Sequence, residues 1–219
     1  MRLQIAGVNL ALRDVESVLR ELEAVYAEFG ARSAAYAADP SNVHLCFAGC
    51  SHCCKRGAFF AVTLVEAVRL ARAIEAMPQS QRAAAQEGAQ ALLAAQRREF
   101  AGDPRDIPGE REPTIFDARV ARVARTGVAC PLLENDLCTV YDGRPFLCRA
   151  YGFPTDAYAV EDAATMTFRS LCHLYAGREL HDWVRARDLR AALAELSTRL
   201  AGTDPGRFTS AEAILARLD

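Results

Sequence analysis

The sequence predicts a mainly α fold, a single helical domain that carries irregular, cysteine-rich loops. Three observations lead to this prediction. Apolar residues recur at helical spacing in several segments, two capping boxes mark helix starts, and most cysteines fall in segments too rich in turn residues for a long helix. With 219 residues, 51% of them hydrophobic, the chain is long enough to bury one substantial core.

Helices dominate the first hundred residues. An amphipathic apolar stripe predicts a helix over residues 12–29, and Gly30 is expected to end it. The sequence Thr63-x-x-Glu66 is a capping box, which predicts the start of a second helix. A third helix, rich in alanine and glutamine, is expected over residues 80–100.

Turn-forming residues interrupt this pattern in the middle of the chain. The glycines and prolines of residues 101–113 predict an exposed loop, and a short helix should follow and end at Gly127. Residues 129–154 contain too many turn residues to form one long helix. A capping box at Thr209-x-x-Glu212 predicts the last helix. Helical spacing before it is carried by Trp183, Leu189, Leu193, Leu196 and Leu200.

These elements predict one domain over residues 1–219. Its cysteine-cluster region is expected at residues 44–153, followed by a C-terminal helical extension at residues 155–219. Since the helical segments cover most of the chain outside the cysteine loops, any strands should be short and should lie near the cysteines.

Charge and hydropathy exclude several classes of partner. The formal net charge is -2 and the pI is about 6.1, which argues against a nucleic-acid surface. The longest uncharged apolar stretch, residues 57–65, is far below the roughly 20 residues that span a bilayer. The N-terminus has no signal-peptide pattern, so we expect a cytoplasmic protein. The cytoplasm is reducing, and the eight cysteines of the chain therefore indicate metal binding or thiol chemistry.

The cysteines form two clusters and one outlier. Thiolates two or three residues apart can curl around a common metal centre, so the loops that carry them are expected to bind metal. For the isolated Cys172, an ordinary core residue is an equal alternative, and this cysteine should matter least. The candidate ligands are Cys46, Cys50, Cys53, Cys54, Cys130, Cys138, Cys148 and Cys172.

Three details favour an iron–sulfur cluster, with [4Fe–4S] preferred, over Zn²⁺. The side chains of the adjacent Cys53 and Cys54 diverge, which suits a multi-iron cluster, two separate centres, or one ligand plus one core residue. The Cys130-Pro131 step resembles the end of bacterial ferredoxin motifs. In addition, one structural zinc needs only four of the eight thiols. Zinc remains the alternative.

Two arginines and two histidines accompany the cysteines. Arg144 and Arg149 are candidate cofactor-binding residues, because guanidinium groups would offset the negative charge of a four-thiolate site; ordinary surface positions are the alternative. His44 and His52 lie in or beside the first cluster, where solvated loop residues are more common than ligands, and we leave them out of the ligand set.

The cysteines belong to a longer motif in two parts. It reads Cys46-x3-Cys50-x2-Cys53-Cys54 and Cys130-Pro131-x-Leu133, followed by Cys138-x-x-Tyr141-x-x-Arg144-Pro145-x-x-Cys148-Arg149-x-Tyr151. This pattern resembles a bacterial cysteine-cluster family described as zinc- or iron-chelating, which includes YkgJ-type proteins. Flagellin lysine N-methylases carry a similar cysteine pattern, and for that branch the resemblance implies an iron–sulfur centre.

Two functional hypotheses follow. In the first, cysteines from both halves of the chain hold one metal ion or cluster with a structural or redox role, and the metal is the only partner predicted. In the second, an enzyme uses the cluster, either as an S-adenosylmethionine-dependent protein-lysine methyltransferase relative or as a radical enzyme, whose clusters share the Cys-x3-Cys-x2-Cys spacing. The helical flanks and the missing glycine-rich segment favour the first hypothesis.

Overall fold

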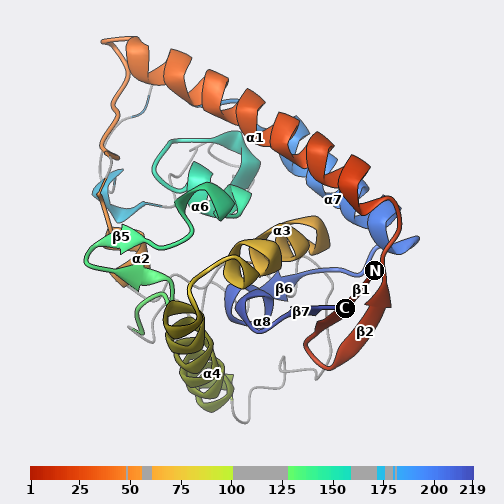
Figure 1. The fold of residues 1–219 in the computed structure, drawn as a ribbon. Helices are drawn as coiled ribbons and strands as arrows, with labels where there is room; N and C mark the ends of the chain where they lie inside the picture. Colours follow the sequence, from red (N-terminus) through yellow and green to blue (C-terminus); the bar gives the residue numbers. More distant parts are fainter. Residues whose placement is uncertain (48, 56–60, 101–127, 159–171, 176–179, 181) are drawn as a thin grey trace.

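Helices form most of the computed structural model, as the sequence predicts, and the strands are short (Figure 1). The structure describes residues 1–47, 49–55, 61–100, 128–158, 172–175, 180 and 182–219. The predicted loop at 101–113 and the helix ending at Gly127 lie outside these residues. In chain order the helices are α1 (Val15–Ala38), α2 (His52–Lys55), α3 (Leu64–Glu75), α4 (Gln79–Phe100), η1 (Tyr141–Gly143), α6 (Phe146–Ala150), η2 (Asp156–Tyr158), η3 (His173–Tyr175), α7 (Arg187–Ala201) and α8 (Ser210–Ile214).

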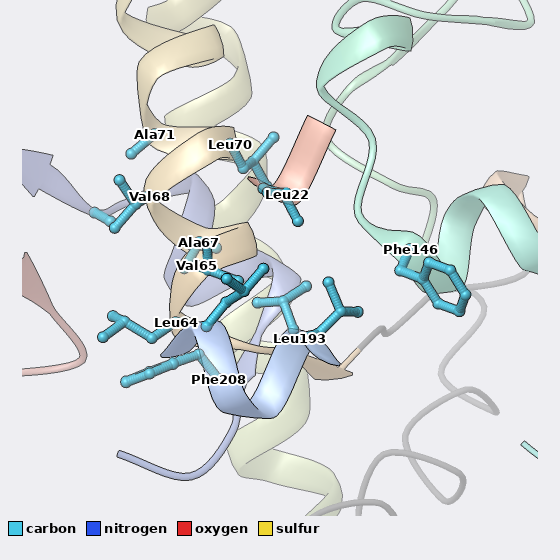
Figure 2. Close-up of a cluster of buried hydrophobic side chains, with 14 of the residues drawn as sticks. Leu22, Leu64, Val65, Ala67, Val68, Leu70, Ala71, Phe146, Leu193 and Phe208 are labelled. Atoms are coloured by element: carbon cyan, nitrogen blue, oxygen red, sulfur yellow. The ribbon is translucent and has the colours of Figure 1, made fainter. Parts of the chain in front are cut away.

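Helix α3 lies at the centre of the core. It contacts α1, α7 and α8, and most of its side chains are fully buried, which is why its sequence is apolar on several sides. Burial of each large aliphatic side chain contributes about 1.5–3 kcal/mol. Figure 2 shows this cluster around α3, in which the labelled residues are Leu22, Leu64, Val65, Ala67, Val68, Leu70, Ala71, Phe146, Leu193 and Phe208.

Both predicted capping boxes are confirmed. The backbone N–H of Thr63 donates to the Glu66 carboxylate at 2.8 Å, at the start of α3. At the start of α8, the N–H of Glu212 donates to the Thr209 hydroxyl at 3.0 Å, and the N–H of Thr209 donates to the Glu212 carboxylate at 2.8 Å. These local patterns satisfy backbone donors that no intrahelical carbonyl can reach.

The expectation that Gly30 ends the first helix is wrong. Helix α1 continues to Ala38, and Gly30 does not adopt the positive φ typical of a helix end. Two features beyond Gly30 hold the extra turns. Ser33 and Tyr36 are buried, and the Arg32 guanidinium binds the Asp188 carboxylate of α7 at 2.8 and 2.9 Å. Packing therefore overrides a local stop signal.

The expected helix around Trp183 begins later in the structure. Helix α7 starts at Arg187, so Trp183 precedes it. The physical reason is a cap supplied from elsewhere in the chain. The carboxylate of Asp156 accepts hydrogen bonds from the N–H groups of Ala186 and Arg187 at 2.6 and 3.0 Å. No sequence pattern beside the helix could indicate this start.

The prediction that strands lie near the cysteines is correct for the strand pair of residues 133–138, which contains Cys138, and wrong for the strand pair of residues 2–11. The latter pair is joined by Ala6 and Gly7, which both have positive φ, as in the two-residue turns of tight hairpins. It lies across the molecule from α2 and from the strand of residues 137–138 (Figure 1). The strands are β1 (Arg2–Ile5), β2 (Val8–Ala11), β3 (Ala61–Val62), β4 (Leu133–Glu134), β5 (Leu137–Cys138), β6 (Phe208–Thr209) and β7 (Arg217–Leu218).

The strands pair in three small antiparallel sheets. β1 lies between β2 and β7, with Leu3 opposite both Leu10 and Leu218, so the two ends of the chain meet. β3 pairs with β6, and β4 pairs with β5. Within the described part of the chain, no helix has the combined length and apolarity that a bilayer span requires.

Candidate metal centre

All eight cysteines line one cavity, although more than a hundred residues of sequence separate the first from the last. None of the eight is part of a disulfide bond. The cavity has a volume of about 90 Å³, several times the roughly 10–15 Å³ that a single water needs by the same measure. The cysteines brought together are Cys46, Cys50, Cys53, Cys54, Cys130, Cys138, Cys148 and Cys172.

The first cysteine cluster leads into α2. Before the helix, a turn with Gly49 at φ 88° lets the N–H of Cys50 donate to the carbonyl of Phe47 at 3.0 Å. The helix then carries Cys53 and Cys54, whose sulfur atoms are 3.9 Å apart. The local fold thus delivers closely spaced thiols to the cavity.

The second cluster is attached to the first by direct hydrogen bonds. The N–H of Cys130 donates to the carbonyl of Cys54 at 2.7 Å. In the turn between β4 and β5, Asp136 accepts a hydrogen bond from the Ser51 hydroxyl at 2.8 Å and forms an ion pair with Lys55. Cys138, on β5, is therefore held against α2.

Helix α6 presents Cys148 to the cavity, and a buried carboxylate fixes this helix. The carboxylate of Glu66 caps α3 and also accepts a hydrogen bond from the N–H of Phe146 at 2.6 Å. Glu66 is only 3% exposed. The capping box predicts the first of these contacts; the second joins residues far apart in sequence and has no local signal.

A glycine lines the cavity beside Cys46, and a tyrosine holds this glycine against the segment that carries Cys46. The hydroxyl of Tyr175 donates to the carbonyl of Gly152 at 2.9 Å and accepts from the N–H of Leu45 at 3.0 Å. Gly152 packs directly on Cys46: a Cβ atom at this glycine would lie 2.3 Å from the Cys46 sulfur. Neither residue was a candidate from the sequence, where an isolated tyrosine or glycine carries no chemical signal.

Burial and crowding disfavour thiolate formation in the cavity. Burial and the neighbouring Cys50 thiol raise the pKa of Cys46 to about 11. The pKa of Cys54 is raised to about 12, mainly because its thiol interacts with that of Cys130. Burial also raises the pKa of Cys148, with Cys54 adding to the shift. A bound cation would reverse this preference, because metal ligation requires and stabilises the thiolate.

The two arginines play different parts. Arg144 lines the cavity, and its charge lowers the pKa values of the Cys46, Cys138 and Cys148 thiols against the larger effect of burial. The side chain of Arg149 instead donates to the carbonyl of Arg144 at 2.9 Å and lies 4.1 Å from the ring centre of Tyr26. Of these two arginines, Arg144 is the one placed to offset charge inside the cavity.

The two histidines in and beside the first cluster lie in different surroundings. His52 lines the cavity, whereas His44 stacks on Phe153 with ring centres 4.6 Å apart. His181 and the side chain of His173 lie outside the described residues.

The described thiols gather without enclosing a common point. Among the residues that the structure describes, no three His, Cys, Asp or Glu side chains are arranged to hold an ion. Ligation would therefore require rotation of the cysteine side chains, which have only one χ angle to reset. An all-sulfur donor set suits soft metals, either as tetrahedral zinc or as an iron–sulfur cluster.

A protein-family model matches the part of the chain that carries the cysteines. Residues 45–173, more than half of the chain, match the CxxCxxCC model, described as a putative zinc- or iron-chelating domain. The matched region includes all eight cysteines that line the cavity. No curated protein and no solved structure matches the chain.

Proposed function

The chain belongs to the CxxCxxCC family of zinc- or iron-chelating domains, and from this premise we propose that its cysteines hold an iron–sulfur centre with a structural or redox role. The observation that carries the proposal is the gathering of eight thiols, from both halves of the chain and without a disulfide among them, around one cavity. Such a donor set binds metal, and its binding energy would stabilise the contacts between distant segments.

The choice of an iron–sulfur centre over zinc rests on the size of the cavity and on the placement of the thiols. The cavity is large enough for a group of several atoms, and the adjacent Cys53 and Cys54 supply two sulfur atoms from one helical turn. A [4Fe–4S] cluster is the best-fitting group of this kind.

When bound, such a cluster supplies one-electron redox chemistry or holds loops together. This chain's residues would ligate it through thiolates, and Arg144 would offset part of the negative charge of the thiolates. Free thiols persist in a reducing compartment, so the proposed location is the cytoplasm.

Purification of the full chain without oxygen tests which metal it holds. We expect a brown protein that contains iron and acid-labile sulfide in equal amounts and bleaches in air, since thiolate-bound clusters absorb visible light and are oxygen-sensitive. Elemental analysis and a sulfide assay provide the measurement. Gly30→Ala serves as the control variant, because its added Cβ meets nothing within 4 Å.

Two outcomes would contradict the proposal in different ways. A colourless protein with stoichiometric zinc and no sulfide would exclude the iron–sulfur assignment while retaining metal binding. A folded protein that contains neither metal, and acquires neither on incubation with iron and sulfide or with zinc, would exclude the proposed function itself.

A further inference from the structure

The number of thiols in the cavity exceeds the needs of one centre. A tetrahedral zinc ion or a cubane cluster takes four cysteine ligands. If the proposed function holds, a single centre would leave the other four thiols without a ligand role, although they line the same cavity. The backbone contacts around the cavity divide the eight thiols into two sets.

The first set is tied together by Tyr175. Its hydroxyl joins the segment before Cys46 to Gly152, through the bonds with Leu45 N and Gly152 O, and its own N–H donates to the carbonyl of Cys172 at 3.0 Å. Cys46, in turn, packs on Gly152. Two thiols far apart in the chain, Cys46 and Cys172, are therefore held at the same side of the cavity.

A turn places Cys50 in this first set. The N–H of Cys50 donates at 3.0 Å to the carbonyl of Phe47, the residue that follows Cys46, so Cys46 and Cys50 stay at the same side of the cavity. Neighbouring thiols, that of Cys50 among them, also contribute to the raised pKa values of Cys46 and Cys172. The family match also extends to residue 173 and so includes Cys172. The position of Cys172 beside other thiols favours a role as a ligand over that of an ordinary core residue.

The second set is built around Cys54. The N–H of Cys130 donates to the Cys54 carbonyl at 2.7 Å, which holds these two residues next to each other. The β4–β5 hairpin brings Cys138 to the same place, and α6 brings Cys148, whose thiol interacts with those of Cys54 and Cys138.

Helix α2 is where the two sets meet. Consecutive side chains on a helix point about 100° apart, so Cys53 and Cys54 face different directions although their sulfur atoms are 3.9 Å apart. Cys53 interacts with thiols of both sets, namely Cys46 and Cys172 on one side and Cys138 and Cys148 on the other. The divergence of the pair lets each residue serve a different centre.

We propose that the cavity holds two neighbouring four-thiolate centres. The first set comprises Cys46, Cys50, Cys53 and Cys172. The second set comprises Cys54, Cys130, Cys138 and Cys148. Each set draws on segments far apart in sequence, so each centre joins parts of the fold that the other does not.

Zinc loading of matched double variants tests this division. Full-length protein is refolded with excess zinc under reducing conditions, and the retained zinc is measured against a competing chelator. The wild type should retain about two zinc ions per chain, one for each four-thiolate site. The pair Cys46→Ser/Cys172→Ser and the pair Cys130→Ser/Cys138→Ser should each retain one.

A third pair supplies the decisive control. Cys172→Ser/Cys138→Ser also removes two thiols, but it takes one from each set, so both centres should lose zinc to the chelator. If the protein is isolated with iron and sulfide, each double variant with both substitutions in one set (a within-set pair) should keep half of the iron and half of the sulfide. The double variant with one substitution in each set (the cross-set pair) should keep the least iron and sulfide. Circular dichroism is used to check that each variant is folded. A double variant that does not fold is replaced by single substitutions from the same set.

The outcomes separate this proposal from the one on which it rests. A wild type that retains one zinc or one cluster, or within-set pairs that lose all metal, would overturn the two-centre arrangement and leave metal binding intact. Three pairs with equal metal content would also overturn the division. A wild type that binds no metal would overturn the proposed function itself.

Discussion

Replacing Gly152 with alanine is expected to displace the Cys46 thiol and to release the metal that we propose this thiol to hold. The new Cβ would lie 2.3 Å from the Cys46 sulfur, a separation that real structures do not tolerate. Overpacking of this kind destabilises proteins by about 1–3 kcal/mol. For a chain of this size each kcal/mol lowers the melting temperature by about 2–4 °C. Metal content and thermal unfolding measure the two effects.

Two glycines supply matched controls for this variant. Gly143→Ala places a Cβ 2.8 Å from the Cβ of Ala73, so it also introduces a clash, but against an alanine and not a thiol. It should lower the melting temperature and retain the metal. Gly30→Ala meets nothing within 4 Å and should stabilise α1 by about 0.5–1 kcal/mol. Full metal content in Gly152→Ala, or equal metal loss in Gly143→Ala, would refute this account of the cavity wall.

Glu66→Ala should release α6 and reduce metal binding from a position that is not a ligand. The substitution leaves the buried N–H groups of Thr63 and Phe146 without their carboxylate acceptor. Each such orphaned donor costs about 1–3 kcal/mol. Since Cys148 lies on α6, the helix should lose its fixed position at the cavity. Chemical denaturation and metal analysis provide the readouts.

The second capping box provides the control for Glu66. Glu212→Ala removes the corresponding bond to Thr209 N at the start of α8, a helix that carries no cysteine. This variant should lose about 0.5–2 kcal/mol, the usual cost of a lost cap, with its metal content unchanged. Should both variants lose metal alike, general instability and not the position of α6 would explain the effect.

Local patterns predicted the parts of the fold that depend on neighbouring residues. The boxes at Thr63 and Thr209 begin helices because each satisfies backbone donors three residues away. The cysteine-rich loops were recognisable because residues of turn chemistry and thiol spacing stand close together in the sequence. These signals suffice for a mainly α fold and for a metal site assembled from cysteines.

The errors arise where distant contacts decide the structure. Gly30 stays helical because residues beyond it pack on α7, and α7 starts at Arg187 because Asp156 caps it from another segment. The roles of Gly152 and Tyr175 depend on contacts with residues near Cys46, far away in the chain. No pattern of neighbouring residues records such contacts, and only a three-dimensional structure reveals them.

X-ray absorption at the metal edge tests the central claim most directly, namely that thiolates alone hold the metal. On full-length protein purified without oxygen, the account predicts a first shell of sulfur atoms at about 2.3 Å. A first shell dominated by nitrogen or oxygen at about 2.0–2.2 Å would contradict it, because histidine, carboxylate or water would then hold the metal in place of the gathered cysteines.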